Sequence, residues 1–156
     1  TPIEPDEPAG DLHDRLALLG AEALLAALPG IADGSLAAQP QDDALATYAH
    51  KLDKAEALID WSEPAEAIAR RVRAFNPWPV AHTRFEDANL RLWQAEAISG
   101  VGANPGTVMS ATRQGIDVST GQGLLRITEL QLPGKKATTA ADFINAHAIQ
   151  GVTLGA

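Results

Sequence analysis

The chain has 156 residues, enough for one domain with a real core or for one domain plus part of another. A composition that is 46% hydrophobic and 21% charged excludes a disordered chain. With no cysteine, disulfides and thiolate chemistry are excluded, which fits the cytoplasm. No uninterrupted run of roughly 18 apolar residues and no signal peptide are found, so we expect no membrane segment.

The charge of −8 is unevenly divided along the chain. Residues 1–63 carry three basic and 13 acidic side chains (3 − 13 = −10), whereas residues 64–156 carry nine basic and seven acidic ones (9 − 7 = +2). This asymmetry indicates two regions with different roles, although an acidic, solvated surface beside a near-neutral domain would give the same numbers. The first residues, which lack an initiator methionine, are typical of a segment cut from a longer protein.

The first predicted element is a leucine-rich helix. It should begin at Gly10-Asp11, with Asp11 as its N-cap, and end at Pro29-Gly30. Its leucines form an apolar face so broad that we expect a sheet to cover it. No candidate sheet lies within residues 1–60, so its partner is expected upstream.

Residues 32–60 have the composition of a linker, rich in glycine, proline and aspartate. Lys51 and Lys54 are the only lysines of this half. His50 has no cysteine or second histidine nearby, which favours an exposed linker residue over a base or ligand. Trp61 is the expected anchor at the start of the second domain.

Residues 62–81 predict an amphipathic helix followed by a rigid corner. Apolar residues at helical spacing run from Ala65 to Phe75, while Arg70 and Arg73 point away from this stripe. The helix should stop at Asn76-Pro77, because a proline disfavours the helical conformation of the residue before it.

The rest of the chain predicts short strands separated by glycine turns. We expect a hairpin of residues 82–86 and 89–98, turned at Asp87-Ala88 and carrying a bulge near Gln94, and then strands at 107–111, 116–120 and 124–132. An exposed basic turn at 133–136 precedes a helix with a capping box at Thr139. The fold class is α+β: a terminal helical piece of an α/β domain, a linker, and a small OB-like Greek-key β-barrel of five to six strands with flanking helices.

The sequence contains no recognisable catalytic or metal site. Neither glycine cluster, at 100–102 or at 121–123, has the spacing of a nucleotide fingerprint, and no His/Cys group has metal spacing. We therefore expect no catalytic residue and no metal in this chain. Its arginines and lysines could hold a phosphate backbone, or they could simply make a barrel soluble.

Several short segments, in order, resemble the C-terminal half of the methionyl-tRNA formyltransferase family. They are Leu12-His13-Asp14-Arg15-Leu16-Ala17 with Leu19-Gly20, Tyr48-Ala49 with Lys51-Leu52 and Lys54, Ile59-Asp60-Trp61, Arg73-Ala74-Phe75-Asn76-Pro77-Trp78-Pro79, Pro105-Gly106-Thr107, and Gly134-Lys135-Lys136 with Ala141-Asp142-Phe143. The resemblance covers nearly the whole chain.

The resemblance implies that residues 1–38 end the catalytic domain, residues 39–61 form the connector, and residues 62–156 form the tRNA-binding barrel. The family transfers a formyl group from 10-formyltetrahydrofolate to the amino group of methionine on initiator tRNA. Its catalytic residues and its folate donor belong to an upstream domain, so this part alone should be inactive. We expect a cytoplasmic monomer.

By the same resemblance, backbone contacts to initiator methionyl-tRNA come from basic side chains of the connector and the barrel. The predicted contacts are Lys51, Lys54, Lys135 and Lys136, and then Arg70, Arg73, Arg84 and Arg113. Arg71 could instead brace the Trp78 corner. Two alternatives stay open: a formyltransferase acting on a nucleotide-linked amino sugar, and a purely structural barrel.

Overall fold

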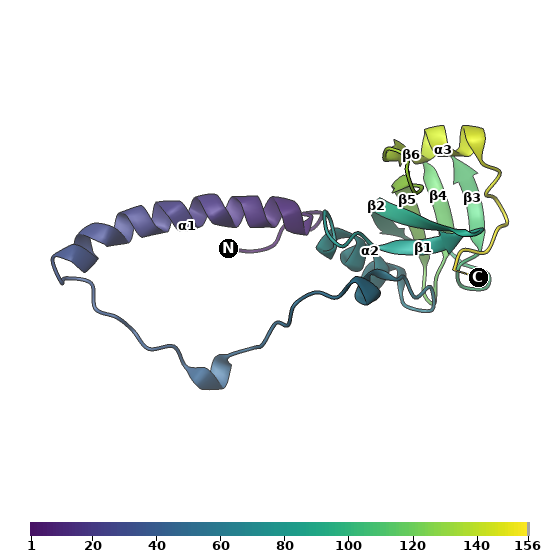
Figure 1. The fold of residues 1–156 in the computed structure, drawn as a ribbon. Coiled ribbons are helices and arrows are strands. Elements are labelled where there is room, and N and C mark those ends of the chain that lie inside the picture. Colours follow the sequence, from purple (N-terminus) through teal and green to yellow (C-terminus); the bar gives the residue numbers. More distant parts are fainter. Residues whose placement is uncertain (156) are drawn as a thin grey trace.

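The computed structural model describes residues 1–155, which form a long N-terminal helix, an extended connector and a β-barrel with two short helices (Figure 1). Helix α1 (Ala9–Ala32) projects away from the barrel. The connector contains two single 3-10 turns, η1 (Asp43–Leu45) and η2 (Lys54–Ala57), and returns the chain to the barrel by a separate path. The barrel takes up the rest of the chain.

Helix α1 differs from the sequence prediction at both ends. Asp11 lies in the first turn and is not the N-cap, which is Pro8. Pro29 does not end the helix either. Proline removes one backbone donor, but the turn after it still closes, since the Asp33 N–H donates to the Pro29 carbonyl at 3.0 Å. The last turn is exposed, so water can satisfy the carbonyl that Pro29 leaves without a donor.

No residue of α1 is buried, and Leu18 and Leu25 are about 70% exposed. The helix is 24 residues long with a mean hydropathy of 1.5 over its most apolar window, so length and composition would allow it to cross a membrane. The core helix of a larger fold would have the same length and composition, so the expectation of no membrane segment stays a prediction. That expectation considered only an uninterrupted apolar run. In residues 16–32 the single charged residue is Glu22, which interrupts the run but barely lowers the mean hydropathy.

Helix α1 begins against the corner that ends α2 (Ala65–Ala74). The Gly10 N–H donates to the Asn76 carbonyl at 3.0 Å, and a Cβ on Gly10 would lie 2.9 Å from Pro77 Cδ. Glycine is therefore needed for this close approach. The peptide bonds before Pro77 and Pro79 are both cis.

Helix α2 confirms the predicted stripe. Its Ala65, Ile68, Ala69 and Val72 are buried, and Phe75 caps the C-terminus. Arg71 does not brace Trp78: its Nη2 donates to Glu63 Oε1 at 3.0 Å, because α2 turns Arg71 toward the segment that leads into the helix.

The sheet has six antiparallel strands: β1 (His82–Phe85), β2 (Ala88–Ile98), β3 (Val108–Thr112), β4 (Gly115–Ser119), β5 (Leu124–Gln131) and β6 (Thr138–Thr139). The order β1-β2-β5-β4-β3, with β6 on β5, is a Greek key, because the long β2–β3 connection sets β2 beside β5. The α+β class and the Greek-key order are thus confirmed. The likeness to an OB fold stays a prediction.

The predicted strand positions hold to within a residue or two. The predicted bulge is confirmed by register shifts on both sides of Gln94. The predicted hairpin turn is one residue late: Phe85 pairs with Ala88, so Glu86 and Asp87 make the turn, and Glu86 takes a positive φ of 53°. Strand β6 was not predicted, since two residues carry no alternation. Thr139 caps α3 (Ala140–Ala146) as expected, accepting from the Asp142 N–H.

The barrel core is continuous from the end of the connector to the C-terminal segment. Its members are Ala57, Ile59, Trp61, Ile68, Val72, Leu90, Leu92, Ile116, Val118, Leu125, Ile127, Leu130, Phe143, Ile149 and Leu154, among others. Trp61 is the anchor that the sequence predicts, with its Nε1 donating to the buried Thr83 Oγ1 at 2.9 Å. Ala57 and Ile59, which lie in the predicted connector, also belong to this core.

The C-terminal segment joins the two edges of the sheet. On the β3 side, the Val108 N–H donates to the Val152 carbonyl and the Leu154 N–H to the Gly106 carbonyl, each at 2.8 Å. On the β1 side, the Gly155 N–H donates to the Arg84 carbonyl at 2.9 Å. Residues 151–155 therefore close the barrel between β1 and β3.

Candidate nucleic-acid interface

The basic side chains divide into paired and unpaired groups. Four arginines face acids: Arg15 with Glu7, Arg70 with Glu66, Arg71 with Glu63, and Arg126 with Asp117. The remaining eight have no ion pair within 4 Å among residues 1–155: Lys51, Lys54, Arg73, Arg84, Arg91, Arg113, Lys135 and Lys136. The unpaired group holds the charge that is free to meet an anion.

Arg126 shows why a count of arginines overstates the basic surface. It faces Asp117 across the β4–β5 ladder and donates to both carboxylate oxygens, at 2.7 and 2.9 Å. This contact raises the pKa of the Arg126 guanidinium. Its positive charge is balanced by Asp117 within the barrel and does not add to the basic surface.

Strands β1 and β2 turn a row of polar side chains outward. Thr83 and Phe85 are buried on β1, as are Leu90 and Leu92 on β2, so the residues between them face solvent. His82 lies opposite Arg91, and Arg84 opposite Asn89. Partners directly opposite share a face of the sheet, so these four side chains form one outer patch.

This patch is continuous with the lysines of the connector. Leu58 forms a bridge with His82, and the Ile59 N–H donates to the His82 carbonyl at 2.9 Å. The 3-10 turn that carries Lys54 therefore ends directly beside β1, with Lys51 just before it. Both lysines are exposed.

On the other side the patch reaches the lysines of the β5–β6 turn. Gln131 lies opposite Arg91 on β5, and its Nε2 donates to the Lys135 carbonyl at 2.7 Å. Gln131 is itself held by Trp93, whose Nε1 donates to Gln131 Oε1 at 2.9 Å. A hollow of about 290 Å³, lined by His82, Arg91, Gln131 and the turn after β5, lies between the two groups of lysines.

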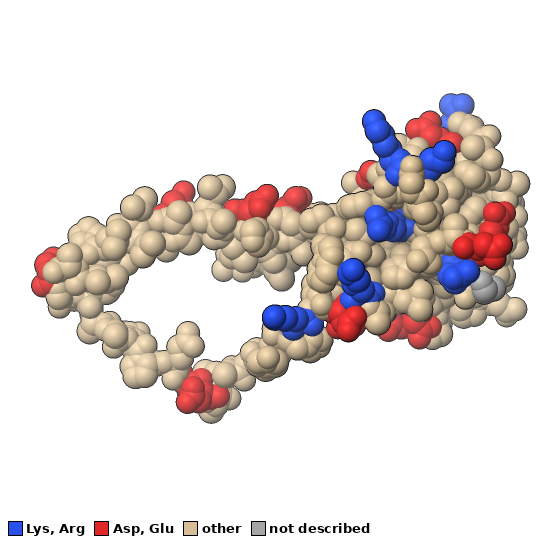
Figure 2. Space-filling view, viewed as in Figure 1, with Lys and Arg blue, Asp and Glu red and all other residues tan. Residues whose placement is uncertain are grey.

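We call the resulting surface the basic band. It consists of Lys51, Lys54, His82, Arg84, Arg91, Lys135 and Lys136. Figure 2 shows blue side chains running over this face, from the end of the connector across β1 and β2 to the turn before β6. In that view acidic side chains lie along α1 and the connector, and others lie beside the blue groups on the barrel.

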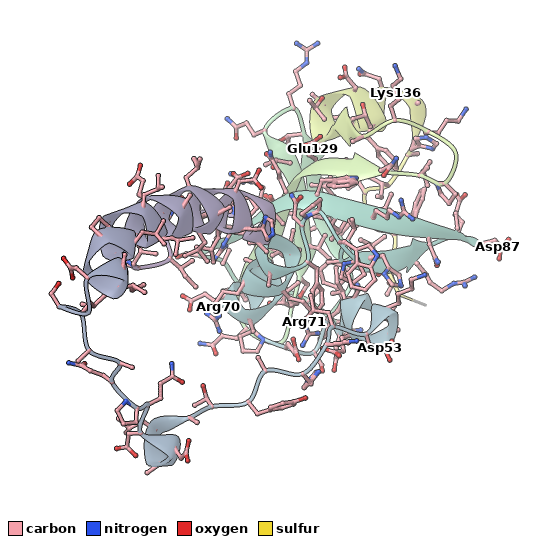
Figure 3. The ribbon with its side chains drawn as sticks, turned by 60° about the vertical axis from the view of Figure 1, so that its left-hand side comes forward. Asp53, Arg70, Arg71, Asp87, Glu129 and Lys136 are labelled. Atoms are coloured by element: carbon pink, nitrogen blue, oxygen red, sulfur yellow. The ribbon has the colours of Figure 1, made fainter. Side chains whose placement is uncertain are left out.

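Five of the eight predicted tRNA contacts lie on this band, and three lie outside it. Lys51, Lys54, Arg84, Lys135 and Lys136 lie on it. Arg70 and Arg73 lie on α2, where Figure 3 shows Arg70 directed away from the end of the barrel that carries Lys136. Arg113 lies in the β3–β4 turn, at the opposite edge of the sheet from β1. The contact of these eight residues with RNA stays a prediction.

Two members of the band, His82 and Arg91, were not among the predicted contacts. The alternation of Arg91 with Leu90 and Leu92 marks it as outward-facing, and this signal was available in the sequence. Its place beside His82 depends on the hairpin register. The turn was predicted one residue late, which shifts each predicted partner by two residues and would set Trp93 opposite His82. That register error hid the pairing.

Fold and surface together define the class of this protein: a small Greek-key barrel with a basic outer face. The chain belongs to the family described as "Formyl transferase, C-terminal domain", whose model matches residues 51–148. The resemblance drawn from the sequence is thereby confirmed.

Individual relatives agree with this family. The chain is 50% identical over 147 residues to the methionyl-tRNA formyltransferase of Pseudomonas savastanoi pv. phaseolicola, covering 94% of this chain and 46% of that protein. It is 48% identical over 154 residues to the enzyme of the same name from Methylococcus capsulatus, covering 98% and 50%. The chain thus spans about half the length of the curated relatives it matches.

Solved structures agree on the fold. A HypX variant from Aquifex aeolicus aligns with a TM-score of 0.70 at 18% identity, over 94% of this chain and 27% of that one. HypX crystallised with tetrahydrofolic acid aligns with a TM-score of 0.62 at 21% identity, over 79% of this chain and 22% of that one. At such identities the likeness concerns the fold alone.

Proposed function

We propose that this chain is the C-terminal half of a methionyl-tRNA formyltransferase. That enzyme moves a formyl group from 10-formyltetrahydrofolate to the amino group of methionine on initiator tRNA. The observation that carries the proposal is 48–50% identity, over nearly the whole chain, to proteins of that name. We place the protein in the cytoplasm, as a monomer.

In this proposal the chain holds the tRNA and leaves the chemistry to an upstream domain. The basic band supplies what phosphate binding requires: exposed cations without internal partners, spread across one face. Such contacts position a nucleic acid without reading its bases. The folate donor and the catalytic residues are assigned to the half of the enzyme that lies outside this chain.

Of the proposed division into residues 1–38, 39–61 and 62–156, helix α1 supports the first part, whereas the barrel core already begins at Ala57. The leucines of α1 are uncovered within residues 1–155, as expected for the last helix of a catalytic domain whose sheet lies upstream. A membrane span would also account for the exposed leucines. We favour the first explanation, because the Methylococcus relative aligns over 154 residues and so shares α1.

The decisive experiment measures formyl transfer by the full-length protein supplied with 10-formyltetrahydrofolate. We expect formylation of initiator methionyl-tRNA and none of a nucleotide-linked amino sugar. The reverse result would make the protein a nucleotide-sugar formyltransferase. Formylation of tRNA with an affinity independent of salt would leave the barrel a structural role only.

A further inference from the structure

An apolar pocket of about 430 Å³ lies at one end of the basic band, between the β5–β6 turn and α3. Its apolar lining includes Leu132, Phe143 and His147, and the exposed Lys135 and Lys136 also contribute to it. Figure 3 shows Lys136 beside α3. Asp142, the acidic residue of the lining, is engaged by Thr139, whose Oγ1 donates to Asp142 Oδ2 at 2.9 Å.

The aromatic rings of this pocket are fixed by one another. Phe143 and His147 stack, with ring centroids 4.4 Å apart and planes 26° apart. Phe85 meets both rings edge-on, at 5.9 and 6.1 Å. Phe143 is only 3% exposed, whereas His147 is half-buried and accessible. A ligand stacking here would therefore meet rings that are already ordered, which lowers the entropic cost of binding.

We propose that this pocket receives one unpaired nucleobase of the bound RNA, stacked against the aromatic pair while Lys135 and Lys136 bind the flanking phosphates. The inference rests on the proposed function for the identity of the ligand as RNA. Proteins that bind unpaired nucleotides combine these two elements, an aromatic surface for the base and cations for the backbone. An apolar peptide would use the aromatic surface but would gain nothing from two adjacent lysines.

The test uses the full-length protein and a single-stranded RNA of about ten nucleotides, within the usual site size. One version carries the fluorescent base 2-aminopurine at its centre, and the other is abasic there. We expect His147→Ala to weaken binding of the first RNA by about 5- to 100-fold, the effect of one stacked base, and to abolish quenching of its fluorescence. Binding of the abasic RNA should not change.

Three further variants make the result specific. His147→Phe keeps a ring and should bind both RNAs as the unmodified protein does. Ala146→Leu, at an exposed position that lines the pocket, should fill the pocket while both rings remain in place, and should cause the same selective loss as His147→Ala. His13→Ala removes a histidine 81% exposed on α1 and should have no effect.

Equal losses for both RNAs, or no loss, in His147→Ala and Ala146→Leu would overturn the inference. Retained tRNA formylation with no discrimination between the RNAs would point to a protein segment as the occupant. Failure of the unmodified protein to formylate initiator methionyl-tRNA would instead refute the proposed function, so the two can fail separately.

Discussion

Replacing Arg91 by glutamine removes one positive charge from the middle of the basic band. The side chain is exposed and has no ion pair among residues 1–155, so the free energy of unfolding should change by less than about 0.5 kcal/mol. If Arg91 contacts one phosphate, its loss lowers the slope of log affinity against log salt by about 0.9, taking the value for B-form DNA. Between about 50 and 200 mM salt, this makes the ratio of unmodified to variant affinity fall by about 3.5-fold.

The assay is a salt titration of initiator tRNA binding to the full-length protein, followed by fluorescence anisotropy. Arg113→Gln is the matched comparison, because it makes the same charge change in the β3–β4 turn, at a predicted contact that lies outside the basic band. We expect the slope to fall for Arg91→Gln only. An unchanged slope for Arg91→Gln would show that Arg91 contacts no phosphate and would refute the basic band as a continuous contact surface, and a fall for Arg113→Gln would extend the contact surface beyond the band.

The other predictions concern the stability of the barrel, measured by urea unfolding. Trp61→Phe should cost about 1–3 kcal/mol, since the buried Thr83 Oγ1 loses its donor; an unchanged stability would contradict this. Ending the chain after Gln150 should cost on the order of 5 kcal/mol, from several backbone bonds and the burial of Leu154, and a native-like unfolding curve would rule out the closing role of residues 151–155. Hydrogen bonds from the Ser62 hydroxyl and N–H lower the pKa of Asp60 in the folded state. That stabilisation is present above the unfolded-state pKa of Asp60 and is lost as the pH falls through its folded-state pKa. From about pH 5 downwards, the free energy of unfolding of the unmodified protein should therefore fall more steeply with pH than that of Asp60→Asn. The same pH dependence in both proteins would exclude the effect.

Local patterns predicted most of the barrel. The stripe of α2, the Thr139 cap and the strands from 107 onward each depend on spacing within a few residues, which a sequence displays directly. The bulge at Gln94 was visible as a break in alternation. What could not be read was pairing across long separations.

The C-terminal segment is the clearest example of such pairing. Residues 149–155 show no alternation, yet they bind both β1, about 70 residues away, and β3. The basic band likewise depends on the register of β1 on β2 and of β2 on β5. The sequence therefore predicted the lysines as separate candidates, but it could not show that His82 and Arg91 lie between them.

Closure of the barrel by residues 151–155 has a consequence for synthesis on the ribosome. Helix α2 and the β1–β2 hairpin can form as they leave the exit tunnel, but β1 and β3 keep free edges until Leu154 and Gly155 have emerged. Free edges invite pairing with other nascent chains. A ribosome stalled just before these residues would therefore carry an aggregation-prone intermediate, and a trailing sequence that delays their release would prolong that exposure.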